Sequence, residues 1–137
     1  MAFYKCLRCG FRKFKQITEC DVCGNHVASV TGSTVRLAQK FYDMGCDVRC
    51  TWERAEVNSD CNIAAFYFEM EFYKKYKAEC FPELPVGFEY AEDESMCKLS
   101  YYEDFENRGE FITNLYVKGV IRELYNWAKD LLKVRSI

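Results

Sequence analysis

The clearest pattern of hydrophobic and polar positions is a strict alternation over residues 63–73, which read IAAFYFEMEFY. Apolar side chains occupy every second position on one side of an extended strand: Phe66, Phe68, Met70 and Phe72. The other side carries Glu69 and Glu71 between two tyrosines. A period of two is typical of a strand that packs one face against a core and turns the other face to water.

Three further segments have the pattern of strands. Residues 46–57 alternate, and the side predicted to be apolar and buried carries four residues: Cys46, Val48, Cys50 and Trp52. Residues 88–91 and 97–102 form two shorter strands around the acidic turn EDES. Because the four strands follow one another with turns or loops between them, they are predicted to form an antiparallel meander.

Two segments have helical periodicity. The first begins at a cap formed by Thr31 or Ser33, ends before Gly45, and places Leu37 and Phe41 on one face. The second covers residues 108–134 and has a longer apolar stripe: Val117, Val120, Ile121, Leu124, Trp127, Ala128 and Leu131. Both helices are expected on one face of the sheet. The predicted fold class is therefore α+β, with a two-layer body in the order αββββα.

Charge divides the chain near residue 30. Residues 1–30 carry five basic and two acidic side chains, a net +3, whereas the remainder carries 14 basic and 19 acidic ones, a net −5. The segment VTGSTV lies at this change in composition. We therefore predict two domains, residues 1–30 and residues 31–137, and expect the second to fold without the first.

Four cysteines in the first domain form two Cys-x-x-Cys-Gly motifs: Cys6, Cys9, Cys20 and Cys23. In each motif a tight turn brings both thiolates to one point, and Gly10 or Gly24 permits the left-handed backbone that follows. Two such turns facing each other make a tetrahedral cage of four sulfurs, which suits one structural Zn²⁺ ion. His26, three residues after the last cysteine, is an alternative ligand.

The segments CLRCG and CDVCG resemble the two knuckles of a rubredoxin-like zinc ribbon. The resemblance covers residues 3–27 and does not extend into the rest of the chain. It implies a small metal-stabilised module in which Zn²⁺ has a structural role.

Several function classes lack their sequence signals. The N-terminus has no apolar run typical of a secretion signal, and no stretch of about 18 apolar residues predicts a membrane span. Nine cysteines without such a signal favour a reducing cytoplasmic location.

His26 is the one histidine, and nucleotide-loop, zinc-protease and hydrolase motifs are missing. We therefore expect a non-enzymatic protein, with an enzyme that uses Glu69 and Glu71 as an alternative.

Two surfaces are candidates for binding a partner. Residues 83–106 are acidic and rich in tyrosine, and they supply the residues predicted to bind a protein partner: Tyr90, Glu92, Asp93, Tyr101 and Tyr102. An alternative is that this surface imitates a nucleic-acid backbone and inhibits a basic protein. A basic stripe on the last helix gives another alternative, a nucleic-acid-binding module that uses the ribbon and four cations: Lys118, Arg122, Lys129 and Lys133. Because the net charge is −2, we expect nucleic-acid binding to be weak.

Overall fold

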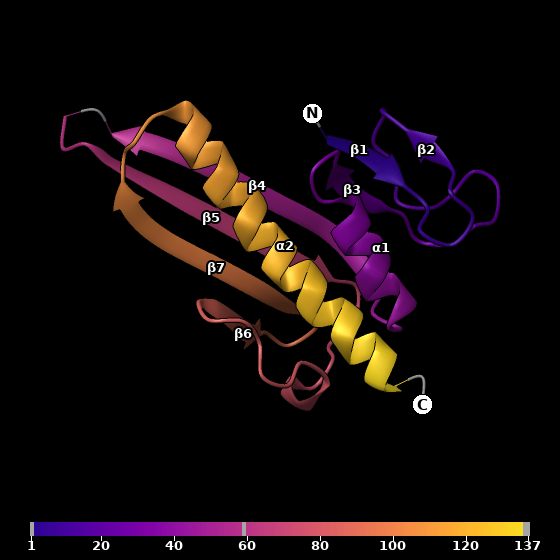
Figure 1. The fold of residues 1–137 in the computed structure, drawn as a ribbon. Coiled ribbons are helices and arrows are strands. Elements are labelled where there is room, and N and C mark those ends of the chain that lie inside the picture. The colour runs from indigo at the N-terminus through magenta and orange to yellow at the C-terminus, as the bar shows by residue number, and fades with distance from the viewer. Residues whose placement is uncertain (1, 59, 136–137) are drawn as a thin grey trace.

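The computed structural model describes residues 2–58 and 60–135, and these form a seven-stranded mixed sheet with both helices on one face (Figure 1). The order across the sheet is β2-β1-β3-β4-β5-β7-β6. The strands are β1 (Ala2–Lys5), β2 (Arg12–Lys13), β3 (Ala28–Thr31), β4 (Val48–Asn58), β5 (Ile63–Phe72), β6 (Phe88–Glu92) and β7 (Cys97–Glu106). The helices are α1 (Val35–Asp43), α2 (Glu110–Arg135) and a short 3₁₀ turn, η1 (Ala78–Cys80). The predicted α+β fold class is confirmed.

The core lies between the sheet and the two helices, as the alternation in β5 predicts. Phe66, Phe68 and Phe72 of β5 are buried together with Phe41 of α1. Helix α2 lies along the sheet in front of β4, β5 and β7, and α1 lies beside its C-terminal half (Figure 1). The rings of Phe41 and Trp127 join the two helices with centroids 5.9 Å apart. None of the described helices is long and apolar enough to cross a membrane.

The predicted meander is wrong in the order of its last two strands. Strand β7, not β6, pairs with β5, and β6 lies at the edge of the sheet. The pairs themselves are antiparallel, as predicted. Strands β5 and β7 match in length, and their register runs from Ile63 opposite Glu106 to Glu71 opposite Lys98. The short β6 follows an irregular segment, residues 73–87, and a tight turn then joins it to the free edge of β7.

A β-bulge reverses the predicted orientation of most of β4. The register shifts between Val48, which lies opposite Phe72, and Cys50, which lies opposite Glu71. The extra residue turns Thr51 toward the core and leaves Trp52 on the outer face with 46% of its surface exposed. Cys50 is therefore on the outer face as well, where it is partly buried, and the prediction that it shares the apolar side of the strand with Cys46 is wrong.

The ribbon strands continue the same sheet. Strand β1 pairs with β3, and β3 pairs in parallel with β4 through Ser29 and Cys50. Val30 and Leu7 are buried in the same core as the helices. The boundary predicted at residue 30 thus falls inside β3. Independent folding of residues 31–137 stays a prediction, and a chain that begins at Thr31 would test it by thermal unfolding.

Candidate metal centre

The two Cys-x-x-Cys-Gly motifs fold into turns of the same geometry. The amide of Gly10 donates to the carbonyl of Cys6 at 2.8 Å, and the amide of Gly24 donates to the carbonyl of Cys20 at 3.0 Å. Both glycines have a left-handed backbone, with φ of +87° and +77°. A side chain at either position would strain this conformation, which explains why glycine follows each motif.

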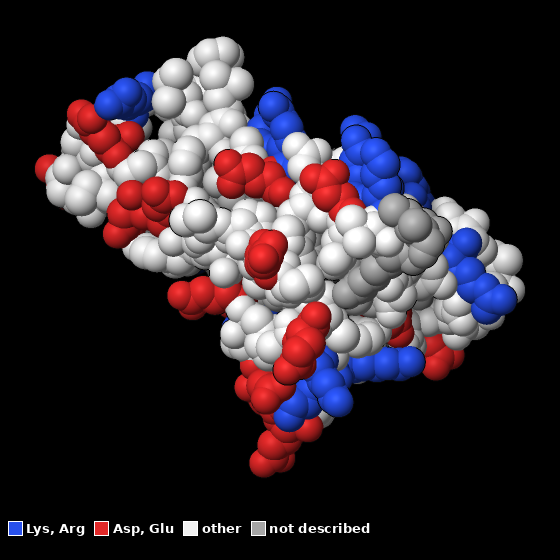
Figure 2. Space-filling model, turned by 60° about the horizontal axis from the view of Figure 1, so that its bottom comes forward, with Lys and Arg blue, Asp and Glu red and all other residues white. Residues whose placement is uncertain are grey.

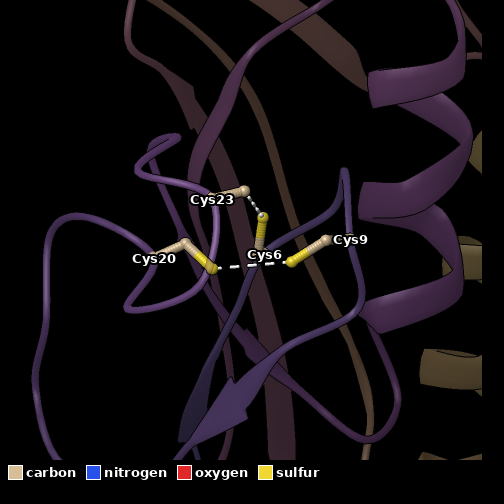
Figure 3. A group of neighbouring side chains, drawn as sticks. All are labelled: Cys6, Cys9, Cys20 and Cys23. Carbon is tan, nitrogen blue, oxygen red and sulfur yellow. Dashed lines mark hydrogen bonds between the residues drawn. The ribbon is translucent and has the colours of Figure 1, made fainter.

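The turns bring four sulfur atoms to one point. The Sγ atoms of Cys6, Cys9, Cys20 and Cys23 all lie within 4.8 Å of one another. Cys6 and Cys23 are 3.5 Å apart, as are Cys9 and Cys20, so each short contact joins one turn to the other (Figure 3). An ion bound tetrahedrally at about 2.3 Å per sulfur places its sulfurs about 3.8 Å apart. The group can therefore hold one metal ion, as the motif spacing predicts.

Backbone amides favour the thiolate form in the second turn. Burial raises the pKa of Cys20, but hydrogen bonds from the amides of Cys23 and Val22 outweigh it and lower this pKa to about 7. The amide of Val22 lies 3.4 Å from the sulfur. Because a thiolate and not a thiol is the metal ligand, this arrangement prepares the site for a cation.

Apart from the cysteines themselves, few buried hydrophobic side chains surround the metal centre. Val27 is buried beside Cys6 and Cys20, and three partly buried side chains complete the cluster: Tyr4, Phe11 and Ile17. A cluster of this size does not stabilise a module of about 25 residues. Metal binding is therefore expected to supply much of the folding free energy of the ribbon.

Comparison with known protein families, with characterised proteins and with solved structures finds no match. The interpretation of the centre and of the surfaces around it therefore depends on their geometry and chemistry.

His26 joins the ribbon to the rest of the molecule. Its Nδ1 lies 3.1 Å from the Asp47 carboxylate, and its ring stacks on Tyr73 with centroids 4.1 Å apart. The hydroxyl of Tyr73 also donates to the carbonyl of Val27 at 2.7 Å. The metal-ligating group found in the described residues consists of cysteines alone. These contacts favour a packing role for His26 over the alternative in which it is a ligand. They join residues far apart in the sequence, so no local motif predicts them.

We expect His26→Ala to leave the metal content unchanged. The substitution should lower the free energy of unfolding by about 1 kcal/mol, because it removes one stacked ring pair and a partly exposed hydrogen bond to Asp47. Elemental analysis and thermal unfolding of the purified variant measure the two quantities. Asn25→Ala, one residue nearer the cysteines, is the control for changes in this loop. Loss of the metal from His26→Ala alone would instead identify the histidine as a ligand.

The structure does not bring the predicted protein-binding residues onto one surface. Tyr102 is on the outer face of β7 and 51% exposed, whereas Tyr101 is in the core with 8% exposed. Tyr90 packs partly against the same core, and its hydroxyl donates to the carboxylate of Glu92 at 2.7 Å. Glu92 and Asp93 are exposed at the turn between β6 and β7. Alternation along β7 explains why two adjacent tyrosines point in opposite directions.

The outer face of the sheet carries an aromatic hollow. The sequence predicted Tyr102 as a binding residue of this face, but it did not predict that Trp52 and Tyr67 lie beside it. The volume of the hollow is about 400 Å³, and we define it by six lining residues: Trp52, Tyr67, Glu69, Glu89, Ser100 and Tyr102. The rings of Tyr67 and Tyr102 pair across β5 and β7 with centroids 4.6 Å apart. The bulge in β4 turns Trp52 into this hollow, and a bulge of this kind leaves no clear signal in the alternation.

Glu69 and Glu71 share the outer face, as the alternation predicts, but each has a cationic neighbour. Glu69 lies 3.0 Å from the ammonium of Lys98, and Glu71 lies 3.7 Å from the guanidinium of Arg49. The thiol of Cys50 also donates to Glu71 at 3.2 Å. Burial, followed by the Glu71 carboxylate, raises the pKa of Cys50 to about 12, which keeps this thiol protonated.

The predicted basic stripe is exposed on α2: Lys118, Arg122, Lys129 and Lys133. Lys118 and Arg122 line a cavity between α1 and α2, and the two C-terminal lysines are not among its lining residues. On the face drawn in Figure 2, basic side chains lie along the upper edge, on the right and in the lower part, and acidic side chains lie on the left, in the centre and in the lower part beside basic ones.

Proposed function

We propose that the chain is a cytoplasmic, non-enzymatic interaction protein of regulatory type, with one structural Zn²⁺ ion in a rubredoxin-like ribbon. The outer face of its sheet binds a basic segment of a protein partner. The observation that carries the proposal is the aromatic hollow, because it presents half-exposed rings beside carboxylates on the face opposite the two described helices.

The ligand set supports zinc in a structural role. Four thiolates at tetrahedral spacing suit Zn²⁺, which has no redox chemistry and accepts this geometry readily. A centre with four protein ligands has no open position for a substrate, unlike catalytic zinc centres. The arrangement of β1 between β2 and β3, with one cysteine turn after β1 and the other before β3, supports the rubredoxin-like interpretation of residues 3–27.

The hollow supports a cationic partner segment. Trp52 and Tyr102 expose aromatic faces, which attract the guanidinium or ammonium group of an arginine or lysine. Glu89 is exposed on the rim, and Glu92 and Asp93 line a second, smaller hollow further along β6. An acidic rim around aromatic anchors speeds the association of a basic partner and fixes its orientation.

The alternatives have weaker support. An enzyme that uses Glu69 and Glu71 would need a free carboxylate pair, yet Lys98 and Arg49 lie beside them. A nucleic-acid-binding module would draw on the four exposed cations of α2. In the ribbon, however, Lys13 pairs with Asp21 at 3.0 Å, and four thiolates around Zn²⁺ add negative charge. A nucleic-acid mimic would use the acidic residues but not the exposed rings.

We expect the double substitution Trp52→Ala/Tyr102→Ala to weaken binding of a basic peptide by about 100-fold or more. Aromatic anchors near the centre of an interface typically contribute about 2 kcal/mol or more each. Fluorescence anisotropy with labelled arginine- and lysine-rich peptides, in moderate salt, measures the affinity. Charge reversal at Glu92 and Asp93 should act mainly on the association rate.

The control is Phe14→Ala, which removes a more exposed aromatic ring from the ribbon. It should leave the peptide affinity unchanged. If the double variant binds the basic peptides as well as the wild type does, the outer face is not the binding surface. If an acidic peptide of the same length binds equally well, the proposed chemistry of the partner is wrong.

A further inference from the structure

A second hollow lies on the other side of the molecule, between α1 and α2. Its volume is about 430 Å³, within the usual range of small-molecule sites. Leu37 and Ile121 contribute apolar surface, and Ser33 and Asn126 contribute polar groups. We call this hollow the interhelical groove. It is separate from the metal centre and from the aromatic hollow, because it shares no lining residue with either.

Three cations line the interhelical groove, and a fourth, Lys40, lies over Tyr125, a ring that also lines it. Helix α1 supplies Arg36, which lines the groove, and Lys40 one turn later. Helix α2 supplies Lys118 and Arg122, which both line it. Arg36 and Lys40 lie over the same ring, that of Tyr125, at 5.4 and 5.7 Å from its centroid. Since Tyr125 itself lines the groove, these contacts place both α1 cations beside a lining residue.

These four cations have no carboxylate within ion-pair distance in residues 2–58 and 60–135. The chain has 21 acidic residues and a net charge of −2, yet no described carboxylate pairs with these four cations. Glu53 comes near the groove through Ser33, and its carboxylate accepts hydrogen bonds from the hydroxyls of Thr31 and Ser33. Like charges without counter-ions repel one another, and this repulsion is relieved when an anion binds.

We propose that the interhelical groove binds a small phosphate-bearing ligand of about nucleotide size. Two guanidinium groups on facing helices suit the oxygens of phosphate, because each can donate two hydrogen bonds in a fixed plane. Lys40 and Lys118 add charge on either side, and Leu37 and Ile121 can contact the remainder of the ligand. This site goes beyond the proposed function, since neither zinc nor the outer face takes part in it.

The test is a calorimetric titration of the zinc-loaded full chain with pyrophosphate, with ATP and with a short oligonucleotide that lacks terminal phosphate. Pyrophosphate and ATP are expected to bind with Kd below about 1 mM. Arg36→Gln/Arg122→Gln should weaken both by about tenfold or more, because each removes charge-assisted hydrogen bonds. The matched control, Lys129→Gln/Lys133→Gln, removes the same net charge from α2 outside the groove and should change the affinity less than about twofold.

Three results would overturn the proposal. The first is that neither pyrophosphate nor ATP binds the wild-type chain. The second is an equal loss in both double variants, which would show diffuse attraction to a basic face and no defined site. The third is binding of the oligonucleotide alone, which would favour the nucleic-acid module. If Arg36→Gln/Arg122→Gln fails to fold, protection of Lys40 and Lys118 from acetylation by bound ATP in the wild type decides the question. Absence of protection would then count against the site.

Discussion

Substitution of Cys6 and Cys20 by serine is expected to abolish zinc binding and to unfold the ribbon. The wild-type chain, purified without added metal, should contain about one zinc ion, and the double variant should contain none. Both cysteines are buried and come from different turns, so the change removes one buried sulfur from each half of the cage. Elemental analysis and the dispersion of amide resonances measure metal content and folding.

The magnitude of this effect follows from the small core of the ribbon. Metal binding contributes on the order of 10–16 kcal/mol in small zinc modules, and whole domains are stable by only about 5–15 kcal/mol. Strand β3 also borders β4, and Val30 and Leu7 belong to the main core. Loss of the ion is therefore expected to lower the melting temperature of the whole chain and not only to disorder residues 2–31.

Cys61→Ser is the matched control, because this cysteine is exposed in the turn between β4 and β5, far along the chain from the cage. It should keep the zinc and the melting temperature of the wild type. Full zinc retention in Cys6→Ser/Cys20→Ser would refute the assignment of the ligands. Zinc loss without any change in the transition of the sheet would confirm the centre and support independent folding of residues 31–137.

Patterns that are local in the sequence predicted their structures well. The alternation in residues 63–73 places Phe66 and Phe68 inside, and the amphipathic helices lie over that face. The metal centre was predictable for the same reason, since each cysteine turn is closed by hydrogen bonds within five residues. The spacing of the cysteines and the glycine after each pair specify the turn geometry that brings the sulfurs together.

Features that depend on distant pairing were not predictable. The alternation within a strand indicates which face is buried, but not which other strand becomes its neighbour. The parallel pairing of β3 with β4 and the position of β6 beyond β7 were therefore not predictable. The bulge near Arg49 moves Trp52 to the outer face by adding one residue to one strand. Tyr101 and Tyr102 were predicted to belong to one binding surface. Because they are adjacent in β7, their side chains point to opposite faces of the sheet. The interhelical groove likewise combines residues of α1 and α2 that are 80 or more positions apart.

Phe68→Ala is expected to lower the free energy of unfolding by about 3–5 kcal/mol, the usual cost of removing a buried phenylalanine ring. Phe68 is 1% exposed in the middle of β5, an inner strand of the sheet, and its ring contacts that of Phe88 with centroids 6.0 Å apart. Neighbouring strands on both sides hold the backbone, so the cavity has little freedom to collapse. Denaturant unfolding followed by circular dichroism measures the loss.

Phe14→Ala is the control for this prediction, since the ring of Phe14 is 73% exposed and its removal should cost less than about 0.5 kcal/mol. A loss below about 1 kcal/mol in Phe68→Ala would mean that the face of β5 toward the helices is not the core.

The same variant also tests how the ribbon depends on the sheet. Because β3 is hydrogen-bonded to β4, zinc release should follow unfolding of the sheet at the lower melting temperature. If the zinc stays bound after the sheet has unfolded, the ribbon is a separate folding unit despite the continuous sheet.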